Sequence, residues 1–231
     1  MASSNRISEN DESEETLTNQ ISEEFSRIQK LHDDAVLKFK RSVPFILEYA
    51  LKAKPKIYEE VSNKFSNANV RALVLLTKLL TVTLSKNTTS PEEREHIKNF
   101  KTSIESIPSS ALFQVVPEGT DVENHVSEET HPVLSEQLAP IFPYLLWSTR
   151  DFRSGMIYLK IDKLCFLIER VENEDSILRA FDIFIKAHHV FMLKYHPYLR
   201  TTLFDYFESL YGIKTPLNSV ARFVTALRNM N

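Results

Sequence analysis

The chain has few of the two residues, glycine and cysteine, that mark several common classes of functional site. Its 231 residues include three glycines and one cysteine, Cys165. Few glycines mean few backbone positions with positive φ, and the sequence contains no Gly-rich phosphate-binding loop. A single cysteine excludes an intrachain disulfide, which is typical of a reducing compartment. We therefore expect an intracellular protein, in the nucleus or the cytoplasm.

Long apolar runs are also missing. Residues 1–15 are polar and acidic and lack the apolar core of a signal peptide. The longest apolar stretch, Val70 to Leu84, is interrupted by Arg71 and Lys78 and is shorter than the roughly 20 residues that cross a membrane. We expect no membrane span. Residues 1–15 contain almost nothing to bury, and we expect them to form a disordered acidic tail.

No group of residues has the pattern of a catalytic or metal site. Cys165 lies in an apolar run, where a thiol is more often a small core residue than a nucleophile. His189 and His196 are seven residues apart, about 10 Å along a helix, which is too far to share a metal ion. Adjacent His188 and His189 point in different directions, and we expect hydrogen-bonded helix histidines here. The sequence predicts no enzyme, no metal and no cofactor.

What the sequence does contain is apolar residues three or four positions apart, from Leu17 to Leu227. This spacing is the period of an amphipathic helix. We predict an all-α fold, an irregular bundle of eight or nine helices with no strands. Residues 134–147 and 150–171 are two of the predicted helices, and a third covers 174–195.

Several helix boundaries carry local signals. Asn67 or Asn69 can cap a helix that is apolar on all sides and therefore central in the bundle. Ser90 and Pro91 open a further helix, which stops before Pro108. Gly212 is well placed to end a short aromatic helix that starts near residue 198.

We expect one domain over residues 16–231. Its N-terminal helical half covers 16–107 and its C-terminal helical half covers 132–231. The long acidic loop 108–131 separates them, and loops of this length are usually functional or disordered. An apolar island around Phe113 and Val115 lies inside this loop. It docks on the body, forms a short strand or binds a partner.

Positive charge gathers between residues 36 and 58, although the formal net charge of the chain is −3. Aromatic residues such as Phe39, Phe45 and Tyr49 alternate with the basic ones. Aromatics beside basic side chains can stack on the bases of single-stranded RNA, and an acidic partner protein suits the segment equally well. The predicted basic patch consists of Lys38, Lys40, Arg41, Lys52, Lys54 and Lys56.

The C-terminal third is rich in aromatic residues, which are enriched at the cores of protein interfaces. Several are tyrosines, which suit positions where one edge stays wet. The candidate partner-binding residues are Tyr195, Tyr198, Tyr206, Tyr211, Phe113 and Val115. These features favour a non-enzymatic helical adaptor or scaffold subunit of an intracellular multiprotein complex. It would bind helices or peptides of other proteins, or a second copy of itself, through hydrophobic grooves.

Two alternatives stay open. One is a helical RNA-binding protein that uses segment 36–58, which the negative net charge disfavours. The other is a lipid-binding helical sandwich. The spacing of Trp147, Arg150 and His188 or His189 is loosely similar to that in glycolipid-transfer proteins, which are also all-helical. The Asp-x-x-x-Asn-x-x-Lys headgroup motif of that family is missing upstream of Trp147, so the lipid alternative ranks last.

Overall fold

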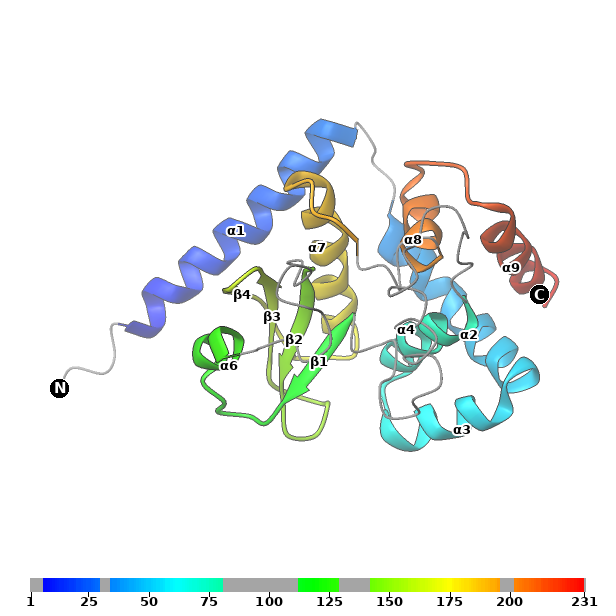
Figure 1. Cartoon of the computed structure of the whole chain (residues 1–231), viewed down its shortest axis with the longest axis horizontal. Helices are drawn as coiled ribbons and strands as arrows, with labels where there is room; N and C mark the ends of the chain where they lie inside the picture. The colour runs from blue at the N-terminus through cyan, green and yellow to red at the C-terminus, as the bar shows by residue number, and fades with distance from the viewer. Residues whose placement is uncertain (1–5, 30–33, 81–111, 129–141, 196–201, 231) are drawn as a thin grey trace, which may run out of the picture. The chain divides into compact units, whose positions relative to one another are not determined.

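The computed structural model describes residues 6–29, 34–80, 112–128, 142–195 and 202–230 (Figure 1). Over these residues it contains eight helices and a four-stranded mixed sheet, so the predicted all-α fold is wrong. In chain order the elements are α1 (Arg6–Gln29), α2 (Ala35–Ala53), α3 (Pro55–Lys64), α4 (Ala68–Leu79), β1 (Phe113–Val116), α6 (Val122–Glu128), β2 (Tyr144–Ser148), β3 (Met156–Ile161), β4 (Leu164–Arg170), α7 (Ser176–Val190), α8 (Leu203–Tyr211) and α9 (Asn218–Arg228).

The chain folds into two compact units. Residues 1–32 and 115–194 form the first, here called the sheet unit, and residues 33–114 and 195–231 form the second, called the helical unit. Each unit therefore combines segments from both halves of the chain.

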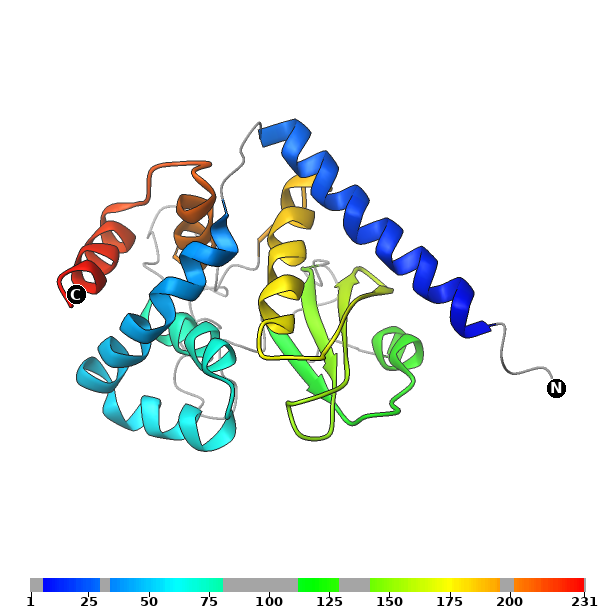
Figure 2. The same ribbon diagram turned by 180° about the vertical axis from the view of Figure 1, so that it is seen from behind.

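The sheet has the strand order β1-β2-β3-β4, and β2, β3 and β4 are antiparallel neighbours. All five residues of β2 are buried, because both faces of the sheet are covered. Helix α7 packs against β2, β3 and β4, while α6 packs against β4 (Figures 1 and 2). Helix α1 lies along α7 and also contacts β4.

Alternation along β2 assigns its side chains to the two faces. Tyr144 and Leu146 belong to a buried cluster that also holds Val122 and Val126 of α6. Leu145 and Trp147 point to the opposite face. An ion pair between Glu169 of β4 and Arg179 of α7, 2.6 Å apart, links the sheet to α7.

Residues 150–171, predicted as one long helix, form β3 and β4 instead. Ile157, Ile161, Leu164 and Ile168 do have helical spacing, but Ile157, Leu159 and Ile161 also alternate as a strand requires. Isoleucine prefers strands, since its branched side chain packs well on a pleated surface. The turn between Ile161 and Leu164 distinguishes the hairpin from a helix.

That turn consists of two residues, because Ile161 lies opposite Leu164 in the register of the hairpin. Asp162 has a φ of 54°, the left-handed conformation that tight hairpin turns need and that Asp tolerates better than most residues. A helix cannot continue through this conformation. The chain therefore reverses at Asp162 and Lys163.

The connection between β2 and β3 is held by a close backbone approach. Gly155 has a φ of 108°, and a Cβ added there would lie 2.1 Å from the carbonyl oxygen of Ser148. The carbonyl of Ser154 accepts hydrogen bonds from Trp147 Nε1 at 3.2 Å and from Thr149 Oγ1 at 2.8 Å. Only glycine combines this backbone angle with this contact.

Other predicted boundaries also change. The segment 108–131, predicted as a loop, contains β1 and α6, and the short-strand interpretation of Phe113 and Val115 is confirmed. Residues 144–147, the last part of the predicted helix 134–147, belong to strand β2 instead. Helix α1 starts at Arg6, inside the predicted disordered tail. The helix predicted from Ser90 lies outside the described residues.

The helical unit is organised around α2, which packs against α3, α4, α8 and α9. The predicted Asn67 cap is confirmed, since its side chain accepts from the backbone N–H groups of Asn69 and Val70. Helix α4 is buried on nearly all sides, as predicted. Gly212 ends α8 with a φ of 76°, which confirms its predicted role. Among the described helices, none has the length and apolar character to span a membrane.

His188 of α7 is a core residue of the sheet unit, with 3% of its surface exposed. Its Nδ1 donates to the Phe184 carbonyl at 2.8 Å, because a carbonyl oxygen only accepts. The hydrogen-bonded helix histidine that the sequence predicts is therefore confirmed. Burial disfavours the charged ring and lowers the pKa of His188 to about 4.

The contact at Gly155 can be tested by substitution with alanine. We expect Gly155→Ala to lower the free energy of unfolding by more than about 3 kcal/mol, because the new Cβ would collide with backbone. Gly119→Ala is the matched control: its φ is also positive, at 85°, but no atom lies within 4 Å of the added Cβ. The control should cost only about 1 kcal/mol of backbone strain. Equal losses in denaturant unfolding would contradict this account.

The buried His188 predicts a pH dependence of stability. Its pKa in the folded protein, about 4, lies below the ordinary value of 6.5, so the unfolded chain binds more protons between these two values. The contribution of His188 to the free energy of unfolding should thus rise with pH across this window, by up to about 3 kcal/mol, and level off above it. NMR titration of the ring protons should give a midpoint near 4 when folded and near 6.5 in urea. A folded midpoint near 6.5 would refute it.

Candidate functional site

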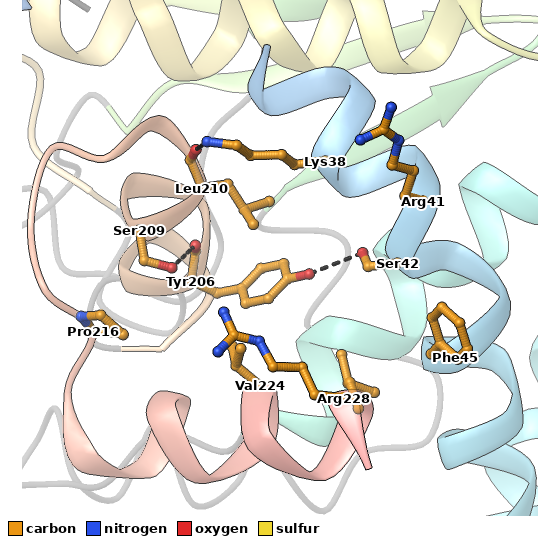
Figure 3. Close-up of a pocket in the computed structure, with 11 residues that line it drawn as sticks. Lys38, Arg41, Ser42, Phe45, Tyr206, Ser209, Leu210, Pro216, Val224 and Arg228 are labelled. Atoms are coloured by element: carbon orange, nitrogen blue, oxygen red, sulfur yellow. Dashed lines mark hydrogen bonds between the residues drawn. The ribbon is translucent and has the colours of Figure 1, made fainter. Parts of the chain in front are cut away.

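A pocket of about 490 Å³ opens in the helical unit, between α2, α8 and α9 (Figure 3). This volume lies within the usual range for ligand-binding sites. Aromatic contacts position its walls. Phe39 of α2 packs on Phe207 of α8, with ring centroids 5.2 Å apart, and Phe223 of α9 meets Tyr49 at 5.3 Å and Tyr206 at 6.0 Å. The pocket thus rests on the aromatic core that joins the three helices.

The lining is apolar, with a basic rim. Its apolar part comes from Phe45, Tyr206, Leu210, Pro216, Val224 and Leu227. Lys38 and Arg41 both come from α2, one turn apart, and Lys38 extends toward Leu210 of α8, while Arg228 comes from α9 on the other side (Figure 3). The described residues that line the pocket include no acid. The rim is therefore suited to an anionic group.

The two rim arginines keep their hydrogen-bonding capacity for a ligand. Both are exposed, and within the described part of the chain neither forms an ion pair or a hydrogen bond through its guanidinium. Lys38 differs, because its ammonium donates to the Leu210 carbonyl at 3.1 Å and so ties α2 to α8. Each guanidinium can bind a carboxylate with two parallel hydrogen bonds.

A pair of hydroxyl groups forms the polar part of the floor. Ser42 Oγ donates to the Phe39 carbonyl at 2.7 Å, so its proton is used there. The Tyr206 hydroxyl, 3.0 Å away, must then donate to Ser42 Oγ, since each group carries one proton. Burial raises the pKa of Tyr206 to about 12 and keeps the phenol neutral. Both protons are consumed inside the protein, so the floor offers acceptors only.

A buried charged cluster forms between α8 and the segment that follows it. Asp205 is 1% exposed and Glu208 is 5% exposed. The Lys214 ammonium is 3.1 Å from Asp205 Oδ1 and also pairs with Glu208, while the Tyr195 hydroxyl donates to Glu208. Burial by itself would lower the pKa of Lys214, but its two acidic partners outweigh this and raise it. Burial, and then the Glu208 carboxylate, raise the pKa of Tyr195.

The structure separates the candidate partner-binding residues. Tyr206 and Tyr211 are buried in the helical unit, and Phe113 is also buried. Tyr195 is half-buried and stacks on Phe204 at 3.9 Å. Val115 in β1 is exposed, and Tyr198 lies outside the described residues. Tyr206 is the member of this set that lines the pocket.

The basic patch is spread over α2 and α3. Lys38 and Arg41 reach the pocket, as described above. Lys52 pairs with Glu48 at 2.6 Å, and Lys54 donates to the Lys78 carbonyl at 2.8 Å. The remaining two, Lys40 and Lys56, are exposed. Of the aromatics interleaved with these residues, Phe39 is buried in the core, and Phe45, Tyr49 and Tyr58 are half-buried.

The described lining of the pocket offers three cationic side chains and a neutral phenol, and the cationic groups can bind and orient an anionic ligand. Among the described residues, no three His, Cys, Asp or Glu side chains come close enough to hold a metal ion.

Sequence reasoning did not find Arg228 or the Asp205–Glu208–Lys214 cluster. For Arg228 the only signal is its position one residue after Leu227, on an amphipathic helix. For the cluster there was a signal: Asp205 and Glu208 are the two charged residues of α8, which is otherwise mostly aromatic and apolar. Charged residues at such positions are rarely buried unless they are paired.

Comparisons with known proteins identified no similar protein. No protein-family model, curated protein or solved structure was found to match the chain.

Proposed function

We propose that this protein is a non-enzymatic adaptor or scaffold subunit that binds an acidic, amphipathic segment of a partner protein in the pocket between α2, α8 and α9. The observation that carries the proposal is the pairing of an apolar lining with a rim of Lys38, Arg41 and Arg228. A helix or peptide with apolar residues on one face and acidic residues beside them is complementary to both parts. The single cysteine of the chain supports an intracellular setting, nucleus or cytoplasm.

The distribution of charge favours a peptide over the alternatives. The rim cations come from two helices, so several separated negative charges are needed to meet them, whereas a fatty acid carries one. Stacking of RNA bases needs exposed aromatic faces. In segment 36–58 these aromatics are buried or half-buried, and Tyr49 packs edge-on against Phe223.

Selection from a library of displayed random 16-residue peptides tests this proposal. We expect the selected peptides to be enriched in Asp and Glu, with Leu or Phe at a spacing of three or four. Their affinity should fall at least about tenfold in the double variant Arg41→Glu/Arg228→Glu, since two attractive contacts become repulsive. Both arginines are exposed, so the fold should persist, which the thermal midpoint checks.

The matched control is Lys52→Glu/Lys56→Glu, which changes the net charge by the same amount on exposed residues that do not line the pocket. It should leave peptide affinity within about twofold of the wild type, because exposed charges at a distance are screened by salt. Equal losses in both double variants would contradict a specific site. Enrichment of no peptide, or tight binding of single-stranded RNA that only the control pair weakens, would overturn the proposal.

A further inference from the structure

The two hydroxyl groups on the floor of the pocket are hydrogen-bonded in one direction. Ser42 Oγ donates to the Phe39 carbonyl at 2.7 Å and accepts the proton of the Tyr206 hydroxyl at 3.0 Å. A hydroxyl oxygen has two lone pairs, so Ser42 Oγ keeps one for a further donor. Ser42 lines the pocket and is half-buried, whereas Tyr206 is 1% exposed. The acceptor that the floor offers to a ligand is therefore Ser42 Oγ.

This arrangement discriminates between ligand groups that donate a hydrogen bond and those that accept one. A group that donates to Ser42 Oγ leaves both internal hydrogen bonds in place. A group that only accepts needs the proton of Ser42 or Tyr206, and each of these protons is already used inside the protein. Such an acceptor gains one hydrogen bond only by breaking another, so its net contribution is small. The floor thus favours a donor.

The rest of the lining is suited to a large apolar group around that donor. The hydroxyl pair lies among Leu210 of α8, Phe45 of α2 and Val224 of α9 (Figure 3). Tryptophan combines a large apolar ring system with one N–H group that donates and does not accept. Phenylalanine and leucine fill the same kind of space without a donor. The indole ring is therefore the side chain that matches both the walls and the floor.

We propose that the partner segment inserts a tryptophan into this pocket, with its indole N–H donating to Ser42 Oγ and acidic residues beside it pairing with Arg41 and Arg228. This inference rests on the proposed function and deepens it, because it names the side chain that enters the pocket. Ser42 is then a specificity-determining residue, which selects tryptophan over other apolar side chains. Tryptophan is also among the residues most enriched at the positions that dominate binding in protein interfaces.

Exchange of the indole N–H for sulfur tests this inference. The probe is the tightest-binding acidic peptide from the display selection, in which we expect one tryptophan besides the other apolar residues. A second peptide carries benzothienylalanine at that position, which keeps the shape of the indole but has sulfur in place of the N–H. Titration calorimetry should give the sulfur peptide an affinity about fivefold lower, the contribution of one hydrogen bond.

A double variant of the protein shows whether Ser42 accepts that hydrogen bond. Ser42→Ala/Tyr206→Phe removes both hydroxyls together, so neither is left without its partner. It should bind the tryptophan peptide about fivefold more weakly than the wild type does, and the sulfur peptide within about twofold. The matched control, Arg41→Glu/Arg228→Glu, should weaken both peptides by the same factor. Thermal midpoints check that each variant is folded.

A second measurement needs no variant of the protein. An isotope label on the indole nitrogen of the peptide keeps its NMR signal separate from that of Trp147, the single tryptophan of the chain. In the complex, we expect the labelled N–H proton to exchange with solvent at least about tenfold more slowly than in the unbound peptide. Exchange at the unbound rate would overturn the hydrogen bond to Ser42.

The outcomes distinguish this inference from the proposed function. Acidic peptides that bind through Leu or Phe alone, or tryptophan peptides that lose no affinity on exchange for sulfur, overturn the tryptophan anchor and leave the binding of acidic segments standing. An equal loss on exchange for sulfur in the wild type and in Ser42→Ala/Tyr206→Phe also overturns it, because the indole then donates elsewhere. If no acidic peptide binds, the proposed function fails and the anchor fails with it.

Discussion

The contact between α2 and the last two helices is the interaction on which the helical unit depends. Ser42 and Tyr206 are 164 residues apart in the sequence, yet their hydroxyl groups are hydrogen-bonded at 3.0 Å. Around this pair, Phe39, Phe207 and Phe223 bury their rings against one another or against tyrosines of the facing helices. Buried aromatic pairs of this kind combine large apolar area with preferred ring geometry. These contacts set the spacing of α2, α8 and α9, and the pocket lies between the same three helices.

The acidic side chains of α8 do not line the pocket, so the described lining is positively charged. Acidic groups of α8 are turned away from the pocket and are neutralised in part by Lys214, while the described residues that line the pocket contribute positive charge alone. If Asp205 or Glu208 instead pointed into the pocket, it would pair with Arg41 or Arg228 and cancel the attraction for an anionic ligand. The cluster therefore connects α8 to the segment before α9, and neither of its carboxylates lines the pocket.

Local signals were enough to predict some elements, and non-local pairing explains most of the errors. The Asn67 cap, the apolar α4 and the Gly212 terminus of α8 each follow from a few adjacent residues. The sheet does not, because Ile157 and Ile161 satisfy helical and strand spacing together, and only the turn at Asp162 and the pairing of β3 with its neighbours distinguish the two structures. For the pocket, Lys38 and Arg41 were in the predicted basic patch and Tyr206 was among the candidate aromatics. Their convergence with Arg228 could not be foreseen, since it requires α9 to return beside α2.

The division of each unit between distant parts of the chain has a consequence for synthesis on the ribosome. Residues 115–194 complete the sheet unit while residues 195–231 are still to be made. During that interval α8 is absent, so Phe39 of α2 lacks the Phe207 ring that packs against it in the folded unit. The helical unit can therefore be completed only after α8 and α9 have been synthesised.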